Sequence, residues 1–218
     1  MNIQKRDFNK EAASWDEVPH RVKLVQDIAK AISNEVTLAP DADVLDFGCG
    51  TGLLSLQLRP LVRSVTGVDN SQGMLDVLKK KIDNQNLTNI RIQYRDVEKG
   101  DALEGCYHLV VSSMTLHHIK KIELLLEQFY RICAPCGHLC IADLDPDDGQ
   151  FHENNEGIFH FGFDRTILRQ AFMEAGFDDI RDRTAAEVIK SIPNGRKRVF
   201  TIFLMTGRKV LEKQAIAR

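Results

Sequence analysis

Short apolar runs alternate with segments of helical period along most of the chain. The runs are too short for helices and are bounded by Gly, Pro or Asp, so they predict buried strands. They lie at residues 44–47, 65–68, 108–112 and 139–142. Residues 90–94 alternate apolar and polar side chains, which predicts a strand near a sheet edge. Apolar positions at helical spacing predict helices around residues 22–32, 74–78, 122–132 and 164–172.

This alternation of strands and helices is typical of an α/β fold with a doubly wound, mostly parallel sheet. The end of the chain differs, because the strand-like runs 179–188 and 199–205 are joined only through Pro193-Asn194-Gly195. Such a connection is too short for a crossover and predicts an antiparallel hairpin. We expect residues 1–36 to form an N-terminal helical cap on the main domain, residues 37–218, within one structural unit.

Composition and charge narrow the class of protein. No apolar run reaches the roughly 20 residues of a membrane-spanning helix, and the polar first ten residues do not resemble a secretory signal. With a net charge of −2, the whole chain is not built to attract nucleic acid. These features predict a soluble, cytoplasmic protein. Residues 190–218 are rich in Lys and Arg and 143–156 in acids, either as solvated surface or, for the basic segment, as a grip for an acidic partner.

The cysteines do not indicate disulfides or a metal site. Their number, five, is odd, and no secretion signal precedes them. Cys133 and Cys136 have the C-x-x-C spacing, but no second pair follows in register to complete a zinc site. We therefore predict that Cys133 is a core residue, that Cys136 lies in a turn, and that the chain has no metal site.

A glycine turn follows the first buried strand, in the sequence Asp46-Phe47-Gly48-Cys49-Gly50-Thr51-Gly52. Its pattern is G-x-G-x-G, with Leu53 where a dinucleotide-binding turn has its third glycine, and no Lys follows as in a nucleoside triphosphate loop. The carboxylate of Asp46 would repel a pyrophosphate but suits a cationic amino group. S-adenosylmethionine has that amino group, a sulfonium and no phosphate. Asp69 ends the second strand, where an acid can bind both ribose hydroxyls.

Five motifs together resemble those of the class I S-adenosylmethionine-dependent methyltransferases. Residues 44–52 resemble the first, 65–71 the second, 94–97 the third, 107–119 the fourth and 129–142 the fifth, so that the resemblance covers roughly residues 40–208. The fifth motif departs from the family's Leu-x-Pro-Gly-Gly, since this chain has Cys133-Ala134-Pro135-Cys136-Gly137. The resemblance implies a seven-stranded sheet of order 3-2-1-4-5-7-6 with the last strand antiparallel.

The same resemblance implies the cofactor and its contacts. In the third motif the acid faces the adenine amino group and the next residue packs on the ring, which assigns these roles to Asp96 and Val97. Together with the glycine turn, it predicts that S-adenosyl-L-methionine is bound by Asp46, Gly48, Cys49, Gly50, Asp69, Asn70, Met74, Asp96, Val97, Ser112 and Ser113.

Methyl transfer needs alignment in a dry site, and a base only where the acceptor must lose a proton. His117 and His118 follow the fourth strand and are the candidates for a base or for a group that holds an acceptor oxygen; alternatively, they cap or support the next helix. Residues 143–163 form either a polar lid, with His152, His160 and Phe161 facing the acceptor, or a divalent-metal site. The lid is the interpretation we favour.

The N-terminal segment 8–16 resembles a cover found in small-molecule members of the family. Trp15 in it either closes over the ligands or anchors a helix to the core. We predict a methyltransferase for a small-molecule acceptor, as a monomer or a homodimer. One alternative is an enzyme acting on RNA or protein through the basic residues Arg196, Lys197 and Arg198; another is a cofactor-binding domain without catalysis.

Overall fold

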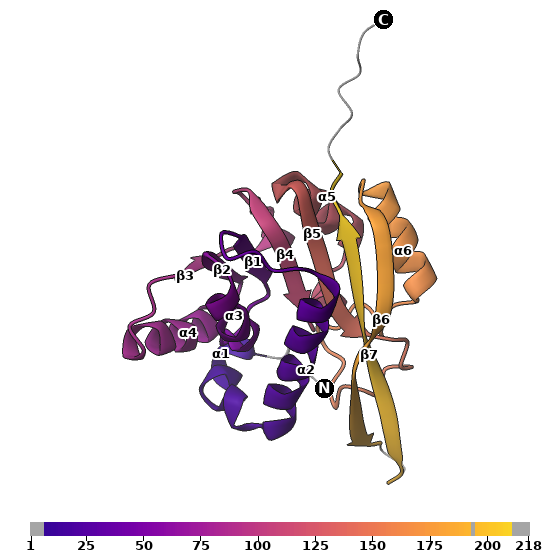
Figure 1. Ribbon diagram of the computed structural model, residues 1–218. Helices are drawn as coiled ribbons and strands as arrows, with labels where there is room; N and C mark the ends of the chain where they lie inside the picture. The colour runs from indigo at the N-terminus through magenta and orange to yellow at the C-terminus, as the bar shows by residue number, and fades with distance from the viewer. Residues whose placement is uncertain (1–6, 193–194, 211–218) are drawn as a thin grey trace, which may run out of the picture.

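A seven-stranded sheet runs through the centre of the computed structural model, which describes residues 7–192 and 195–210 (Figure 1). The strands are β1 (Asp43–Phe47), β2 (Ser64–Asp69), β3 (Ile90–Tyr94), β4 (Tyr107–Ser113), β5 (Cys133–Leu144), β6 (Asp178–Ser191) and β7 (Lys197–Arg208). The α-helices are α1 (Phe8–Glu11), α2 (Pro19–Glu35), α3 (Leu53–Leu58), α4 (Gln72–Asn84), α5 (Ile122–Ile132) and α6 (Arg165–Glu174). Short 3₁₀ helices are η1 (Ala12–Glu17), η2 (Arg59–Leu61), η3 (Val97–Lys99) and η4 (Leu116–His118).

The strand order is β3-β2-β1-β4-β5-β7-β6, which confirms the predicted topology. The first five strands pair in parallel, whereas β7 pairs antiparallel with both β5 and β6. β3 lies at one edge, as its alternating side chains predicted. This order brings the carboxyl ends of β1, β2, β3 and β4 next to one another, and the segments that follow them meet at one edge of the sheet.

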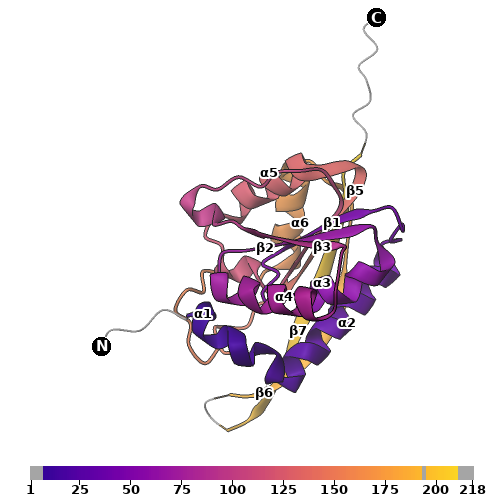
Figure 2. The ribbon, with the colours of Figure 1, turned by 90° about the vertical axis from the view of Figure 1, so that its left-hand side faces the viewer.

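Helices cover both faces of the sheet (Figure 2). Because successive side chains of a strand point to opposite faces, the buried residues form a hydrophobic core on each face. Val44 and Val111 pack with α2 and α3 on one face. On the other face, Leu45 and Val110 pack with α5 and α6. The central strands are therefore buried on both sides, which explains why they read as continuous apolar runs.

Helix starts follow the local sequence. Ser71 precedes α4 and its hydroxyl accepts a hydrogen bond from the N–H of Met74. Asp164 precedes α6 and accepts from the N–H groups of Thr166 and Ile167. Pro19 occupies the first turn of α2, where its missing N–H costs no hydrogen bond.

β5 is much longer than the sequence predicted. β5 begins at Cys133 directly after α5, and its pairing with β4 shifts register between Tyr107 and Leu109. Cys136 has a φ of 63°, so the turn expected there is a local irregularity inside the strand. Cys133 is buried, as predicted, and burial raises the pKa of its thiol to about 12.

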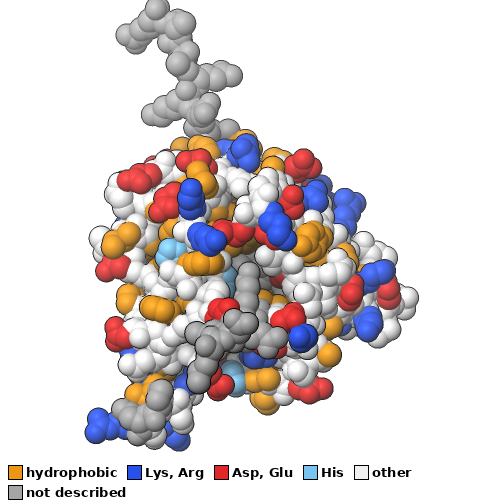
Figure 3. All heavy atoms as spheres, turned by 180° about the vertical axis from the view of Figure 1, so that it is seen from behind, with side chains coloured by type: hydrophobic (Ala, Val, Ile, Leu, Met, Phe, Trp, Pro, Cys, Tyr) orange, Lys and Arg blue, Asp and Glu red, His pale blue; other side chains and the backbone are white. Residues whose placement is uncertain are grey.

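The β6–β7 hairpin extends past the rest of the sheet (Figure 1), because cross-strand pairing continues to Ser191 and Lys197. Pro193 and Asn194 of its predicted turn lie outside the described residues, as do residues 211–218 of the basic segment. Lys and Arg side chains gather at the end of the hairpin, while charges of both signs are interspersed elsewhere on this face (Figure 3). No helix in the described ranges is long and apolar enough to cross a membrane.

Candidate functional site

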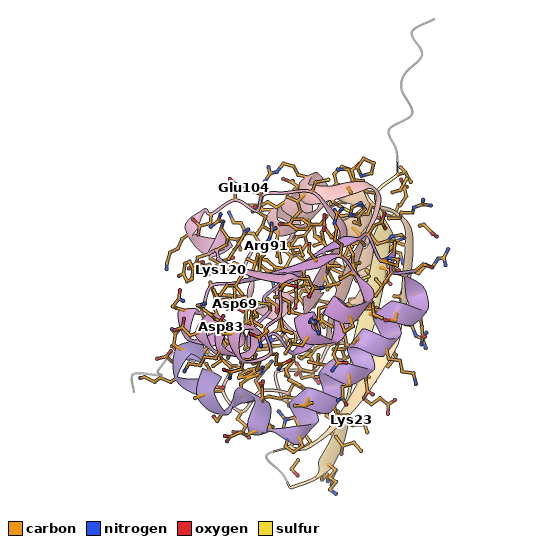
Figure 4. All side chains as sticks on the ribbon, turned by 60° about the vertical axis from the view of Figure 1, so that its left-hand side comes forward. Lys23, Asp69, Asp83, Arg91, Glu104 and Lys120 are labelled. Carbon is orange, nitrogen blue, oxygen red and sulfur yellow. The ribbon has the colours of Figure 1, made fainter. Side chains whose placement is uncertain are left out.

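A cavity of about 810 Å³ opens at the carboxyl ends of the parallel strands. This volume is within the roughly 300–1,000 Å³ of small-molecule sites. Its walls come from the glycine turn, the ends of β2 and β4, the N-terminal segment, the start of α2, the segment after β5 and one side of β6. Asp69 and Lys120 both line it and lie on the same side of the molecule (Figure 4).

The glycine turn owes its shape to residues without a Cβ. Gly48, Gly50 and Gly52 have φ of 70°, 53° and 80°, in the left-handed region that other residues resist. A Cβ on Gly48 would collide with the side chain of Thr115, whereas one on Gly50 would meet only Met74 Sδ at 3.9 Å. The turn is therefore closely packed at Gly48 and open toward the cavity at Gly50.

Asp46 lies beneath this turn, with only 1% of its surface exposed. The Ser55 hydroxyl donates a 2.6 Å hydrogen bond to its Oδ2. Burial, reinforced by the charge of Asp69, raises the pKa of Asp46 to about 6, although the bond from Ser55 opposes this shift. A cationic ligand group nearby would stabilise the ionised form of this carboxyl.

Asp69, at the end of β2, anchors the glycine turn. Its Oδ2 accepts from the N–H of Gly50 and its Oδ1 from the N–H of Ser71, each at 2.8 Å. Burial raises the pKa of Asp69 against these bonds. A carboxylate offers about four acceptor sites, so both oxygens retain lone pairs for ligand hydroxyls.

Asp96 follows β3 and lines the same cavity. Lys99 binds its Oδ2 at 3.0 Å, whereas its Oδ1 is buried without a hydrogen-bond partner. A buried acceptor without a partner is costly, and a donor such as an adenine amino group would satisfy it. Together with the open face at Gly50 and the carboxylates of Asp46 and Asp69, this arrangement fits S-adenosylmethionine.

The remaining predicted cofactor contacts are brought to this cavity with one exception. Cys49, Asn70, Met74, Val97 and Ser113 line it. Ser112 does not, because neighbouring residues of a strand point to opposite faces and its hydroxyl donates to the carbonyl of Phe47 at 3.1 Å.

His117 follows β4 and is almost completely buried. Its Nδ1 lies 2.7 Å from Oδ1 of Asp143, at the end of β5. Burial opposes ionisation of Asp143, but the charge of His117 and its hydrogen bond outweigh this effect, and the pKa of Asp143 falls below its ordinary value. The ionised carboxylate can only accept, so Nδ1 of His117 carries the proton.

His118 is half-buried beside it. Its Nδ1 lies 2.9 Å from the carbonyl oxygen of Gly157, which also only accepts, so Nδ1 is protonated and the neutral ring has its lone pair on Nε2. The rings of His117 and His152 lie 4.2 Å and 6.2 Å from that of His118, between centroids, and Phe8 contacts it edge-on at 5.2 Å. All three histidines line the cavity.

The N-terminal segment is bonded to the cofactor end of the cavity. Oδ1 of Asn9 accepts from the Ser71 hydroxyl at 3.0 Å and from the Gly73 N–H at 2.8 Å. Asp16 accepts from the Thr51 hydroxyl at 2.6 Å and pairs with Lys81. The sequence did not reveal these contacts, because each joins residues at least 30 positions apart in positions that no local pattern marks.

Two carboxylates of the acidic segment after β5 are bonded within the fold. Asp145 pairs with Arg165 at 2.7 Å and accepts from the Thr201 hydroxyl at 2.6 Å. Asp147 accepts from the N–H groups of Gly149 and Phe151. Within the described ranges, no three His, Cys, Asp or Glu residues gather in a way that would hold a metal ion.

Of the three residues expected to face the acceptor from this segment, only one lines the cavity. His152 does so. His160 instead bonds through Nε2 to the carbonyl of Ile119 at 2.8 Å and packs on Phe163. Phe161 is exposed.

Comparison with known proteins agrees with this geometry. Residues 44–137 match the family model described as a methyltransferase domain. An uncharacterized methyltransferase of Schizosaccharomyces pombe is 33% identical over 118 residues, which are 51% of this chain and 42% of the relative. The ubiquinone biosynthesis O-methyltransferase of Coxiella burnetii is 29% identical over 152 residues, 66% of this chain and 64% of the relative. The chain thus spans between two fifths and two thirds of the length of these relatives.

Solved structures share the fold at low identity. The YcgJ protein of Bacillus subtilis superposes with a TM-score of 0.73 at 15% identity, covering 85% of this chain and 99% of that protein. Phosphoethanolamine N-methyltransferase 2 of Haemonchus contortus, in complex with S-adenosyl-L-methionine, gives a TM-score of 0.69 at 15% identity, covering 94% of this chain and 60% of that protein. With its domain match over residues 44–137 and its shared fold, the chain is thus similar to S-adenosylmethionine-dependent methyltransferases.

Proposed function

We propose that this protein transfers a methyl group from S-adenosylmethionine to a small-molecule acceptor bound beside His118. One observation carries the proposal: a single cavity joins three strand-end carboxylates to the cluster of His117, His118 and His152. The carboxylates suit the amino, ribose and adenine groups of the cofactor, and the histidines suit an acceptor that must be oriented or deprotonated.

Three carboxylates would hold the cofactor. Asp46 offers negative charge to its amino group, Asp69 accepts from its ribose hydroxyls, and Oδ1 of Asp96 accepts from its adenine amino group. When bound, the cofactor supplies an electrophilic methyl group on a sulfonium. The protein must then place a nucleophile in line with that methyl group and exclude water.

His118 is the proposed base for that nucleophile. The Gly157 carbonyl holds the proton on Nδ1, which leaves Nε2 as the basic nitrogen of the neutral ring. A hydroxyl or amine of the acceptor would give its proton to this nitrogen as it attacks the methyl group. A positioned base of this kind typically contributes about 10²–10⁴-fold to the rate.

His117 and Asp143 are proposed to position His118. The ionised Asp143 fixes the ring of His117 through Nδ1, and that ring packs against His118 with a centroid distance of 4.2 Å. Neither His117 nor Asp143 needs to exchange a proton with the acceptor in this scheme. Their buried pair keeps the side of the cavity next to the base rigid.

A small molecule is the acceptor that the cavity favours. Phe8, Trp15, Phe151 and Phe159 line it, so much of its surface is apolar and aromatic. Two relatives, a ubiquinone biosynthesis O-methyltransferase and a malonyl-[acyl-carrier protein] O-methyltransferase, are named for oxygen methylation. A hydroxyl acceptor would use His118 as proposed.

The test measures cofactor binding and turnover separately. The purified chain is titrated with S-adenosylmethionine by calorimetry, and S-adenosylhomocysteine is then measured by mass spectrometry across a panel of phenols, hydroxy acids and amines. We expect product with at least one small acceptor. His118→Gln should lower kcat by about 10²-fold or more with little change in cofactor affinity. His138→Gln, in β5 and outside the cavity, is the matched control and should behave as the wild type.

Three results would contradict the proposal. Tight cofactor binding without product across the panel would indicate a binding domain without catalysis. Product formed only with tRNA or protein substrates, in a strongly salt-dependent manner, would indicate a macromolecular acceptor. Equal loss of cofactor affinity and turnover in His118→Gln would place that residue in the cofactor site instead.

A further inference from the structure

We infer that the cavity contains a subsite for an anionic group of the acceptor, a carboxylate or a phosphate, formed by Arg21 and Lys190. This inference rests on the proposed function in one respect, because it assigns the acceptor to the same cavity. It adds the charge class of the acceptor, which the family does not specify. The two cations lie on a wall of the cavity that comes from other parts of the chain than the cofactor carboxylates.

This wall, called here the α2–β6 wall, comes from four parts of the chain that meet beyond the glycine turn. Its lining residues are Trp15, His20, Arg21, Leu24, Val25, Phe151, His152, Val188 and Lys190. They belong to η1, the first two turns of α2, the segment after β5, and β6. None of these lining residues is acidic.

Arg21 is held in place on an aromatic face. Its guanidinium carbon lies 3.8 Å from the ring centroid of Trp15, and its NH1 donates to the Trp15 carbonyl at 3.4 Å. Glu11 is an acidic neighbour of this side chain, at 3.8 Å from NH2. The planar fork of a guanidinium matches the two oxygens of a carboxylate or phosphate, so Arg21 suits recognition of such a group.

Lys190 is held in a similar way on the other side of the wall. Its Nζ lies 4.4 Å from the ring centroid of Phe151 and donates to the carbonyl of the same residue. The alternation along β6 brings Lys190 to the side of Val188, which also lines the cavity. A cation that rests on an aromatic face loses little freedom when an anion binds, because its position is already restricted.

Arg21 and Lys190 line the same cavity. The pKa of His20, in the first turn of α2, is lowered first by burial and then by the charges of both cations. At the cofactor end of the cavity, Lys99 pairs with Asp96 at 3.0 Å. The cofactor carboxylates come from the ends of the parallel strands, whereas Arg21 and Lys190 come from α2 and β6.

The apolar neighbours specify the rest of the ligand. Leu24, Val25 and Val188 line the cavity beside the two cations. An acceptor that fits has an apolar or aromatic body against these side chains and an anionic group against Arg21 and Lys190. Small aromatic carboxylates and aromatic phosphate esters meet this description, whereas their neutral counterparts lack the charged contact.

The experiment measures binding without turnover. Protein loaded with S-adenosylhomocysteine is titrated by calorimetry with benzoate, with phenyl phosphate, and with neutral benzamide and phenol. We expect at least one anion to bind about tenfold or more tightly than its neutral counterpart. Arg21→Gln and Lys190→Gln should each reduce this preference severalfold while keeping the affinity for S-adenosylhomocysteine. Comparison of the two anions distinguishes a carboxylate from a phosphate subsite.

Lys23→Gln is the matched control, because Lys23 lies on the same helix but pairs with Asp27 at 2.6 Å and does not line the cavity (Figure 4). It should leave the preference unchanged. Equal binding of anions and neutral compounds, or a preference that survives both substitutions, would overturn the subsite. Turnover of neutral acceptors with no anion preference would leave the proposed function intact. Anion binding with no turnover of any acceptor would instead contradict the proposed function alone.

Discussion

The buried carboxyl of Asp46 gives the most direct test of how this site is built. Its pKa rises from 3.8 to about 6 because burial disfavours the charged form. A shift of about 2 units corresponds to about 3 kcal/mol of folding free energy. For an acid whose folded pKa is raised, this stabilisation is fully present below the unfolded pKa and is lost as pH rises through the folded value. The protein without ligand thus carries a destabilising charge at neutral pH.

Asp46→Asn removes this titration while keeping an oxygen that accepts from Ser55. The difference in free energy of unfolding, variant minus wild type, should therefore increase by about 2.5 kcal/mol between pH 4 and pH 8. Because the comparison is between pH values, any constant cost of burying the amide cancels. Urea unfolding of both proteins without cofactor, at closely spaced pH values, measures the difference.

Asp43→Asn, on the same strand, is the control with the opposite shift. The hydrogen bond from Arg63 holds the pKa of Asp43 at about 2, so its titration is complete below about pH 4. The difference in free energy of unfolding between Asp43→Asn and the wild type should be constant between pH 5 and pH 8. A constant difference for Asp46→Asn over the full range, or one that falls with pH, would refute the reasoning. The same variant should bind S-adenosylmethionine more weakly, because it lacks the charge that suits the amino group.

Other residues of the site lead to further predictions. Asp69→Ala should weaken cofactor binding by about 1.5–3 kcal/mol, measured by calorimetry, and unchanged affinity in a folded variant would mean that the turn has been misinterpreted. Gly48→Ala should lower the free energy of unfolding, measured by urea titration, by about 1–3 kcal/mol, because of its positive φ and the collision with Thr115. In the control, Gly100→Ala, a Cβ would meet no atom within 4 Å at a φ of 98°, so the loss of stability should be smaller. Asp143→Asn should lower kcat by roughly 10²-fold at unchanged cofactor affinity, and stopped activity together with lost cofactor binding would contradict its positioning role.

Much of the fold followed from local patterns. The apolar runs predicted the parallel strands because buried strands need apolar side chains on both faces. The short connection after residue 192 predicted the antiparallel hairpin. The early start of β5 was not predictable, since it involves the left-handed backbone of Cys136 and a register shift in the pairing with β4. The family resemblance supplied the complete strand order.

The site was predictable where it depends on strand ends. Asp69 and Asp96 follow β2 and β3, and parallel topology brings such residues together. Ser112 and Ser113 could not be distinguished from sequence, because a shift of one residue along a strand changes the face. Arg21 and Lys190 gave no local signal, because a basic residue on a helix or strand usually faces solvent. Their place in one cavity depends on how α2 packs against β6.

The walls of the cavity come from two different parts of the chain, and this division has a consequence for how the protein can change. The carboxylates that suit the cofactor all lie within residues 44–137, whereas the α2–β6 wall lies entirely outside that range. Substitutions at the wall residues of α2, after β5 or along β6 can alter which acceptor fits without disturbing the groups for the methyl donor. A lineage, or a designer, can therefore exchange substrates on this scaffold while the donor site stays unchanged.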